Sequence, residues 1–236
     1  MKIGVVVFPG SNCELDTQHV LKNLLGQEVN LLWHEQRDLE GSDVVILPGG
    51  FSYGDYLRTG AIARFSPIME SVIEFAAKGK PLLGICNGFQ ILLECGLLPG
   101  ALVTNGSLKF ISDDVILKIE SDNSIYTSKY DHSQLLKMPI AHIGGSFFAD
   151  DDTLQEIEGD NRVAFRYCDA AGKVNSDSNP NASIGNIAGI YNKEGNILGL
   201  MPHPERASES LLGSTDGLGL FESLISFNCY LPEARK

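Results

Sequence analysis

Four short apolar runs, separated by segments with helical spacing, constrain the fold of this chain most strongly. The runs are rich in Val, Ile and Leu and occupy residues 2–8, 28–33, 43–47 and 81–85. Such runs are typical of buried parallel strands, and the helical segments between them supply the crossovers that parallel strands need. The first part of the chain is therefore predicted to form a parallel sheet.

Helix signals occur between and after these runs. The first helix should start at Ser11 or Asn12 and end at Leu25, while Pro67 marks a break or a fresh start in the second. Further helices are expected after residue 86 and near the C-terminus. The four predicted helices span residues 11–25, 61–78, 87–95 and 217–229.

The pattern changes after residue 100, where strands are joined by loops rather than helices. These strands are expected at residues 114–120, 139–143, 162–168, 187–191 and 196–201, with a hairpin turn at 193–196 joining the last two. The acidic run 150–152 is interpreted as a solvated turn, with a partner contact or a loose cation site as alternatives. The sequence predicts a single domain, residues 1–236, of the α/β class: a flavodoxin-like three-layer fold with a largely parallel central sheet and a β-rich second half.

Composition excludes several classes of protein. The chain has 236 residues and a net charge of −12, which disfavours nonspecific binding to nucleic acid or anionic membranes. The five cysteines are odd in number and include no C-x-x-C pair, so neither a disulfide framework nor a zinc ribbon is indicated. No apolar run reaches the roughly 18 residues of a membrane span, and the N-terminus lacks a signal peptide. We expect a cytoplasmic protein without a metal site.

Cys86 is the first candidate for catalysis. It lies at a strand-to-helix turn between Gly84 and Gly88, and such glycines allow the sharp elbow that exposes a nucleophile. The N-terminus of the following helix would favour the thiolate. The alternative is that Cys86 is a buried small hydrophobic residue, as most free cysteines are.

His203 supplies a candidate base for this thiol. It follows the predicted strand 196–201 and precedes Pro204, which favours extended backbone, so His203 and Glu205 should point the same way. Glu205 could then orient the imidazole while His203 faces Cys86. A solvated His-Pro-Glu turn is the alternative to this Cys-His-Glu triad.

A third strand end adds candidate oxyanion donors. Gly49 and Gly50 follow the strand at 43–47, and the carboxyl ends of parallel strands share one edge of the sheet. The amides of Gly49, Gly50 and Asn87 could therefore hold a developing oxyanion. On its own, this Pro-Gly-Gly segment would be an ordinary turn.

Taken together, these motifs resemble the class I, or triad, glutamine amidotransferases. Longer segments are similar to the family of glutaminase subunits of phosphoribosylformylglycinamidine synthase: FPGSNC at 8–13, LPGGFSYGDYLRTGAIA at 47–63, GICNGFQIL at 84–92 and GLMPHPERA at 199–207. The resemblance runs from residue 2 to about residue 228. It implies the class I glutamine amidotransferase fold.

The resemblance also implies a reaction and partners. Cys86, His203 and Glu205 would hydrolyse the side-chain amide of glutamine, and Gln90 would shape the glutamine pocket. Ammonia would pass to a large synthetase subunit that converts formylglycinamide ribonucleotide to its amidine in purine biosynthesis, and a small third subunit would complete the complex. ATP and magnesium would belong to the synthetase, with no cofactor in this chain.

Some positions depart from the family pattern. His142 stands where the family has a His-Gly-Glu-Gly-like run, but here His-Ile-Gly-Gly follows, so the acid is missing. The resemblance therefore implies the triad but not the contacts of this loop with glutamine or the partner, and His142 is expected to neighbour the site. Thr59 and Ala182 also depart from the pattern, away from the chemistry.

Several other segments of the sequence have structural rather than catalytic interpretations. Cys13 begins a helix, which could lower its pKa, but it lacks a paired histidine in the motifs, so a structural role is favoured. Segment 50–55 with Arg58 fits no phosphate-binding pattern; it is interpreted as a rim of the site or a synthetase contact. The other histidines show no metal-ligand spacing: His19, His34, His132 and His142. A different cysteine hydrolase and a non-enzymatic regulatory subunit remain as alternative functions.

Overall fold

The computed structural model of the chain describes residues 1–121, 124–131 and 134–227. Among these residues, nine strands form one sheet in the order β2-β1-β3-β4-β11-β10-β9-β6-β7. The first five in this order are parallel: β2 (Glu28–Trp33), β1 (Lys2–Val7), β3 (Val44–Leu47), β4 (Leu82–Ile85) and β11 (Ile197–Leu200). The other four join in antiparallel fashion: β10 (Ile187–Tyr191), β9 (Val163–Cys168), β6 (Ile111–Ile119) and β7 (Leu135–His142). The predicted fold class is confirmed.

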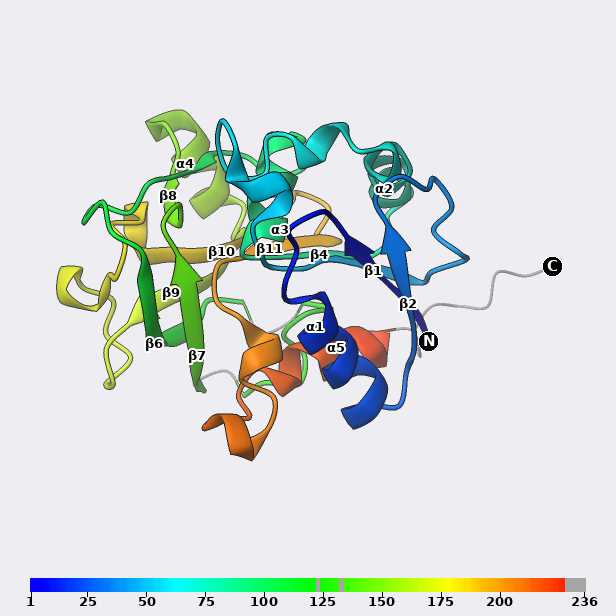
Figure 1. Cartoon of the computed structure of the whole chain (residues 1–236). Helices are drawn as coiled ribbons and strands as arrows, with labels where there is room; N and C mark the ends of the chain where they lie inside the picture. Colours follow the sequence, from blue (N-terminus) through cyan, green and yellow to red (C-terminus); the bar gives the residue numbers. More distant parts are fainter. Residues whose placement is uncertain (122–123, 132–133, 228–236) are drawn as a thin grey trace.

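Helices cover both faces of the sheet (Figure 1). Helices α1 (Glu14–His19) and α5 (Leu218–Phe227) lie on one face, and α2 (Pro67–Ala77) and α3 (Asn87–Glu94) lie on the other. Pro67 is the first residue of α2, so it starts a fresh helix after a short 3-10 turn, Ala63–Phe65. The result is the three-layer arrangement that the sequence predicts.

The centre of the sheet positions the candidate site. Every residue of β3, β4 and β11 is buried, as expected for strands covered on both faces. Parallel pairing sets Leu47 beside Gly84 and Ile85 beside Leu200. The segments that follow these three strands, which carry Gly49, Cys86 and His203, therefore leave the sheet at the same edge.

The first helix begins later than predicted, at Glu14 rather than at Ser11 or Asn12. Ser11 forms an isolated bridge with Gly50, and its hydroxyl accepts a hydrogen bond from the Phe8 amide at 3.1 Å, so the chain must turn before the helix starts. The last turn, Val20–Leu24, is π-helical.

The acidic run at 150–152 is not the solvated turn that the sequence suggested. Asp150 caps helix α4 (Asp151–Gly159) by accepting a hydrogen bond from the Thr153 amide at 2.8 Å. Carboxylates are stabilised at a helix N-terminus, and a single fully buried residue, Ile157, left little apolar periodicity to reveal the helix.

Two short strands also escaped prediction, β5 (Ala101–Val103) and β8 (Ser146–Phe148), which pair in antiparallel fashion. The predicted hairpin between β10 and β11 is confirmed.

Cys13, Cys86, Cys95 and Cys168 are free thiols. Within the described ranges, no helix is both long and apolar enough to span a bilayer. His132, Cys229 and the end of the last predicted helix lie outside the described residues.

Candidate active site

Cys86 occupies a strained turn between β4 and α3. Its φ of 50° and ψ of −103° place it outside the regions that side-chain-bearing residues prefer. A Cβ on Gly88 would lie 1.9 Å from the carbonyl oxygen of Leu47, and one on Gly84 would lie 2.8 Å from the Gly88 backbone. The flanking glycines therefore permit the close packing of α3 on β3 and β4 that the predicted elbow requires.

His203 and Glu205 form a buried pair just beyond β11. The His203 Nδ1 atom lies 2.6 Å from Glu205 Oε1, and the two residues are 1% and 2% exposed. Burial alone would lower the pKa of His203, but the Glu205 carboxylate and the neighbouring Cys86 sulfur outweigh it and hold that pKa well above its usual range. Nε2 of His203 is buried and has no hydrogen-bond partner among the described residues. It is therefore the ring nitrogen left to exchange a proton with a thiol.

Gly49 lies against the His203 ring and Gly50 lies against Ser11 and Asn12, and neither position leaves room for a side chain. A Cβ on Gly49 would lie 2.7 Å from Cε1 of the His203 ring. Gly50 has a φ of 139°, and a Cβ there would lie 2.7 Å from the Asn12 amide nitrogen. Both positions require glycine for the backbone to approach the site; the role of the amides as oxyanion donors stays a prediction.

The side chains of Asn87 and Gln90 tie three segments together around Cys86. The Asn87 carboxamide accepts from the Ser52 amide at 3.1 Å and donates to Gln90 Oε1 at 2.8 Å. Gln90 in turn donates to the carbonyl oxygen of Gly144 at 2.7 Å. Asn87 also donates to Asp55, a half-buried residue of the segment 50–55 that the sequence suggested as a rim of the site. Burial raises the pKa of Asp55 to about 6, against the effect of this hydrogen bond.

Cys13 lies closer to the site than its place in the sequence suggested. Its Sγ atom is 3.9 Å from Nδ1 of His203, accepts a hydrogen bond from Arg206 at 3.2 Å and donates to Asn12 at 3.0 Å. Burial raises the pKa of Cys13, whereas its position at a helix start had suggested a lowered one. The ligand atoms of Cys13, His203 and Glu205 lie within 4.8 Å of one another, but the Arg206 guanidinium on the same sulfur disfavours a second cation.

His142 lies at the end of β7 and is 3% exposed. Its Nδ1 atom is 3.0 Å from Oδ1 of Asn105, which also accepts from the Gly145 amide at 3.1 Å. The Asn105 amide group donates to the carbonyl oxygens of His142 and Lys109, so the orientation of this carboxamide is fixed. Nδ1 of His142 must therefore carry the hydrogen, and Nε2 is an acceptor.

Burial lowers the pKa of His142 to about 4, with a further contribution from His203. The Nε2 atom is buried and lacks a hydrogen-bond partner in the described part of the chain. The prediction that His142 neighbours the site is thus supported by its position. Asn105 was missed, because its contacts to residues 142–145 cross almost forty positions of sequence.

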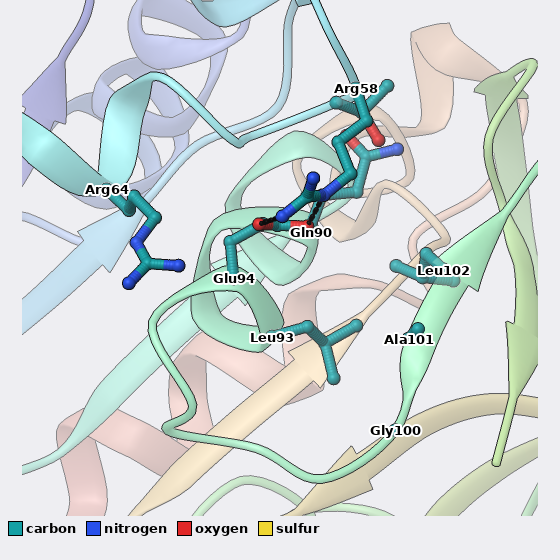
Figure 2. Close-up of a pocket in the computed structure, with 9 residues that line it drawn as sticks. Arg58, Arg64, Gln90, Leu93, Glu94, Gly100, Ala101 and Leu102 are labelled. Atoms are coloured by element: carbon teal, nitrogen blue, oxygen red, sulfur yellow. Dashed lines mark hydrogen bonds and ion pairs between the residues drawn. The ribbon is translucent and has the colours of Figure 1, made fainter.

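Two cavities meet at Gln90. The inner one has a volume of about 10 Å³, about the space of one water; it is lined by Gly50, Phe51, Asp55, Thr59, Cys86, Gln90, Ala141, His142, Ile143 and Gly144. The outer one measures about 240 Å³ and shares Thr59 and Gln90 with it, so Thr59 lies closer to Cys86 than the sequence suggested. Figure 2 shows Arg58 paired with Glu94 in this outer cavity, near Gln90, through two contacts of 2.6 Å.

Residues 1–216 match the family described as the CobB/CobQ-like glutamine amidotransferase domain. The chain belongs to this family. It is 55% identical to the phosphoribosylformylglycinamidine synthase subunit PurQ of Chlorobaculum tepidum, over 95% of this chain and 96% of the relative. Identity to the PurQ subunit of Trichormus variabilis is 57%, over 95% of this chain and 97% of the relative.

Solved structures give the same result. The structure of PurLQS from Thermotoga maritima matches with a TM-score of 0.85 and 40% identity, covering 96% of this chain and 98% of the other. The glutaminase domain of Trypanosoma brucei CTPS, with bound acivicin, matches with a TM-score of 0.58 at 14% identity, which shows a shared fold alone.

Proposed function

We propose that this chain is the glutaminase subunit of a phosphoribosylformylglycinamidine synthase and hydrolyses glutamine to glutamate and ammonia. The relatives that carry this subunit name match along nearly the whole chain. The observation that carries the proposal is the buried His203–Glu205 pair, set beyond β11 beside the strand that delivers Cys86. This is the arrangement that a thiol nucleophile needs from its base and from the group that orients the base.

The proposed reaction has two steps. In the first, the Cys86 sulfur attacks the carboxamide carbon, His203 takes the thiol proton at Nε2 and returns it to the leaving nitrogen, and ammonia departs. In the second, water attacks the glutamyl thioester and His203 accepts its proton. The carbon–sulfur bond then breaks, the sulfur takes this proton from His203, and glutamate is released. The amides of Gly49, Gly50 and Asn87 are the proposed donors to the oxyanion in both steps.

Glutamine binding must widen the inner cavity, which holds about one water. Gln90 lies between the two cavities, so the charged end of glutamine is expected in the outer one. There the Arg58–Glu94 pair offers a guanidinium for the α-carboxylate and a carboxylate for the α-ammonium. With its charged end in the outer cavity, glutamine would place its side-chain amide in the inner cavity, beside Cys86.

Ammonia is proposed to pass to a large synthetase subunit, which uses ATP and magnesium to convert formylglycinamide ribonucleotide to its amidine in purine biosynthesis. A small third subunit would complete the assembly, in line with the PurLQS description of the Thermotoga maritima structure. No cofactor is proposed for this chain. The absence of a disulfide pattern in the sequence supports a cytoplasmic location.

The test is the Cys86→Ala variant in complex with its synthetase. Glutamine-dependent amidine formation should fall by at least about 1,000-fold, while formation from added ammonium should persist. Cys168→Ala, which alters a buried cysteine on β9, is the matched control and should keep both activities. Survival of glutamine-dependent synthesis in Cys86→Ala would support a non-enzymatic subunit. Turnover of peptides or esters in place of glutamine would indicate a different cysteine hydrolase.

A further inference from the structure

A second buried histidine borders the space beside Cys86. His142 lines the inner cavity together with Cys86 and Gln90. The Cys86 thiol points toward the carbonyl oxygen of Ala141, the residue just before His142, at 3.8 Å. Within the described ranges, Nε2 of His142 is a buried acceptor without a donor. An orphaned buried acceptor is costly, so such an atom at a candidate site calls for a ligand that supplies the missing hydrogen bond.

The ring that carries this acceptor is held in place from two sides. Asn105 accepts the hydrogen on Nδ1 at 3.0 Å. Gly145 packs so closely against the ring that a Cβ there would lie 2.2 Å from Cε1 of His142. The acceptor is therefore fixed before any ligand arrives, as expected of a group that stabilises a reacting atom rather than adapting to it.

We propose that His142 is a further catalytic residue: its Nε2 atom accepts a hydrogen bond from the amide nitrogen of glutamine and then from the ammonia that this nitrogen becomes. The inference rests on the proposed glutaminase function. The cavity that His142 shares with Cys86 has room for about one water, and ammonia is a donor of similar size.

The protons in the first step balance with this role. The leaving nitrogen starts with two hydrogens, receives a third from His203 on its lone pair, and donates one of its own to Nε2 of His142 without transferring it. Because burial keeps the pKa of His142 near 4, this ring is neutral at physiological pH and has no proton to give. Ammonia is thus released in its neutral form, the form that can act as a nucleophile in the synthetase.

Three substitutions at residue 142 test the proposal. His142→Leu removes the acceptor while filling similar space. His142→Gln can place a carboxamide oxygen near the position of Nε2. The shorter side chain in His142→Asn can place its carboxamide near the position of Nδ1 but not near that of Nε2. Each variant is assayed in the complex for glutamine turnover. Each is also treated with an electrophilic glutamine analogue that alkylates Cys86 without releasing ammonia.

We expect His142→Leu to lower kcat for glutamine about 100-fold while alkylation of Cys86 by the analogue proceeds at nearly the wild-type rate. His142→Gln should recover at least a tenth of the wild-type kcat, and His142→Asn should not. Wild-type kcat in His142→Leu, equal recovery by Asn and Gln, or loss of alkylation together with turnover would overturn the proposal. Failure of the analogue to label wild-type Cys86 would instead count against the glutaminase function.

Discussion

The two histidines at the ends of β11 and β7 have opposite environments although they lie near one another. The His203 amide donates to the Pro139 carbonyl oxygen of β7 at 2.9 Å, so the segment that follows β11 is joined directly to β7. The ring of His203 contacts the Glu205 carboxylate, and the pKa of His203 is raised. His142 contacts the Asn105 carboxamide instead, and burial lowers its pKa to about 4.

The two sites differ in the charge of the groups around the ring, and that charge decides whether a buried imidazole is protonated. Both rings are almost fully buried, and burial alone disfavours the protonated form of each. A carboxylate reverses this preference, and a neutral carboxamide does not. The site therefore contains one histidine that can hold a proton and one that stays neutral, which suits a reaction that must move one proton and release ammonia uncharged.

Replacing the Glu205 carboxylate is expected to remove the difference in protonation between the two histidines and to have the largest effect. Glu205→Gln removes the charge that raises the pKa of His203, so burial should lower that pKa and leave both rings neutral. We expect glutamine turnover to fall by about 1,000-fold and the alkaline limb of its pH profile to move to lower pH. The measurement is kcat/KM for glutamine from pH 5 to 10. An unchanged limb would show that Glu205 does not set the protonation of His203.

A carboxylate partner should make the protonation of His142 more like that of His203. In Asn105→Asp, a negative charge beside Nδ1 raises the pKa of His142, so part of the population carries a second proton at neutral pH and Nε2 can no longer accept. We expect about a tenfold loss of kcat at pH 7 that recovers as the pH rises. Asn105→Leu is the control for lost hydrogen bonds and should show no such recovery. Equal pH profiles for the two variants would contradict this interpretation.

The neutral state of His142 should also appear in folding stability. Its pKa is about 4 in the folded protein against an ordinary value of 6.5, so the folded state binds fewer protons. This contribution is present above about pH 6.5 and is lost as the pH falls toward 4. Between pH 7 and pH 5, the wild-type protein should lose about 2 kcal/mol more of its free energy of unfolding than His142→Gln does. Urea unfolding at both pH values measures the difference; parallel losses would rule it out.

Most of the parallel half of the molecule could be predicted from local patterns. Apolar runs located β1 to β4 and β11 to within about a residue at each end, since every residue of the central strands is buried. Glycines around Cys86 and the proline after His203 then placed both residues at strand ends. These are features of adjacent residues, which sequence reasoning can evaluate.

The surroundings of the two histidines could not be predicted in this way. Asn105 reaches His142 and Gly145 across two long strands, β6 and β7, and the segment that joins them. Cys13 approaches His203 across 190 positions, because β1 and β3 bring the first helix to the same edge of the sheet. Such contacts depend on how segments pack, and one sequence contains no local signal for them.

The role of Cys86 is tested most simply by peptide mapping with mass spectrometry after exposure to an electrophilic glutamine analogue, with and without excess glutamine. We expect one adduct, on Cys86, that glutamine suppresses. An adduct on Cys13 instead, or labelling of Cys86 that glutamine does not prevent, would contradict the claim that Cys86 is the nucleophile of a glutaminase.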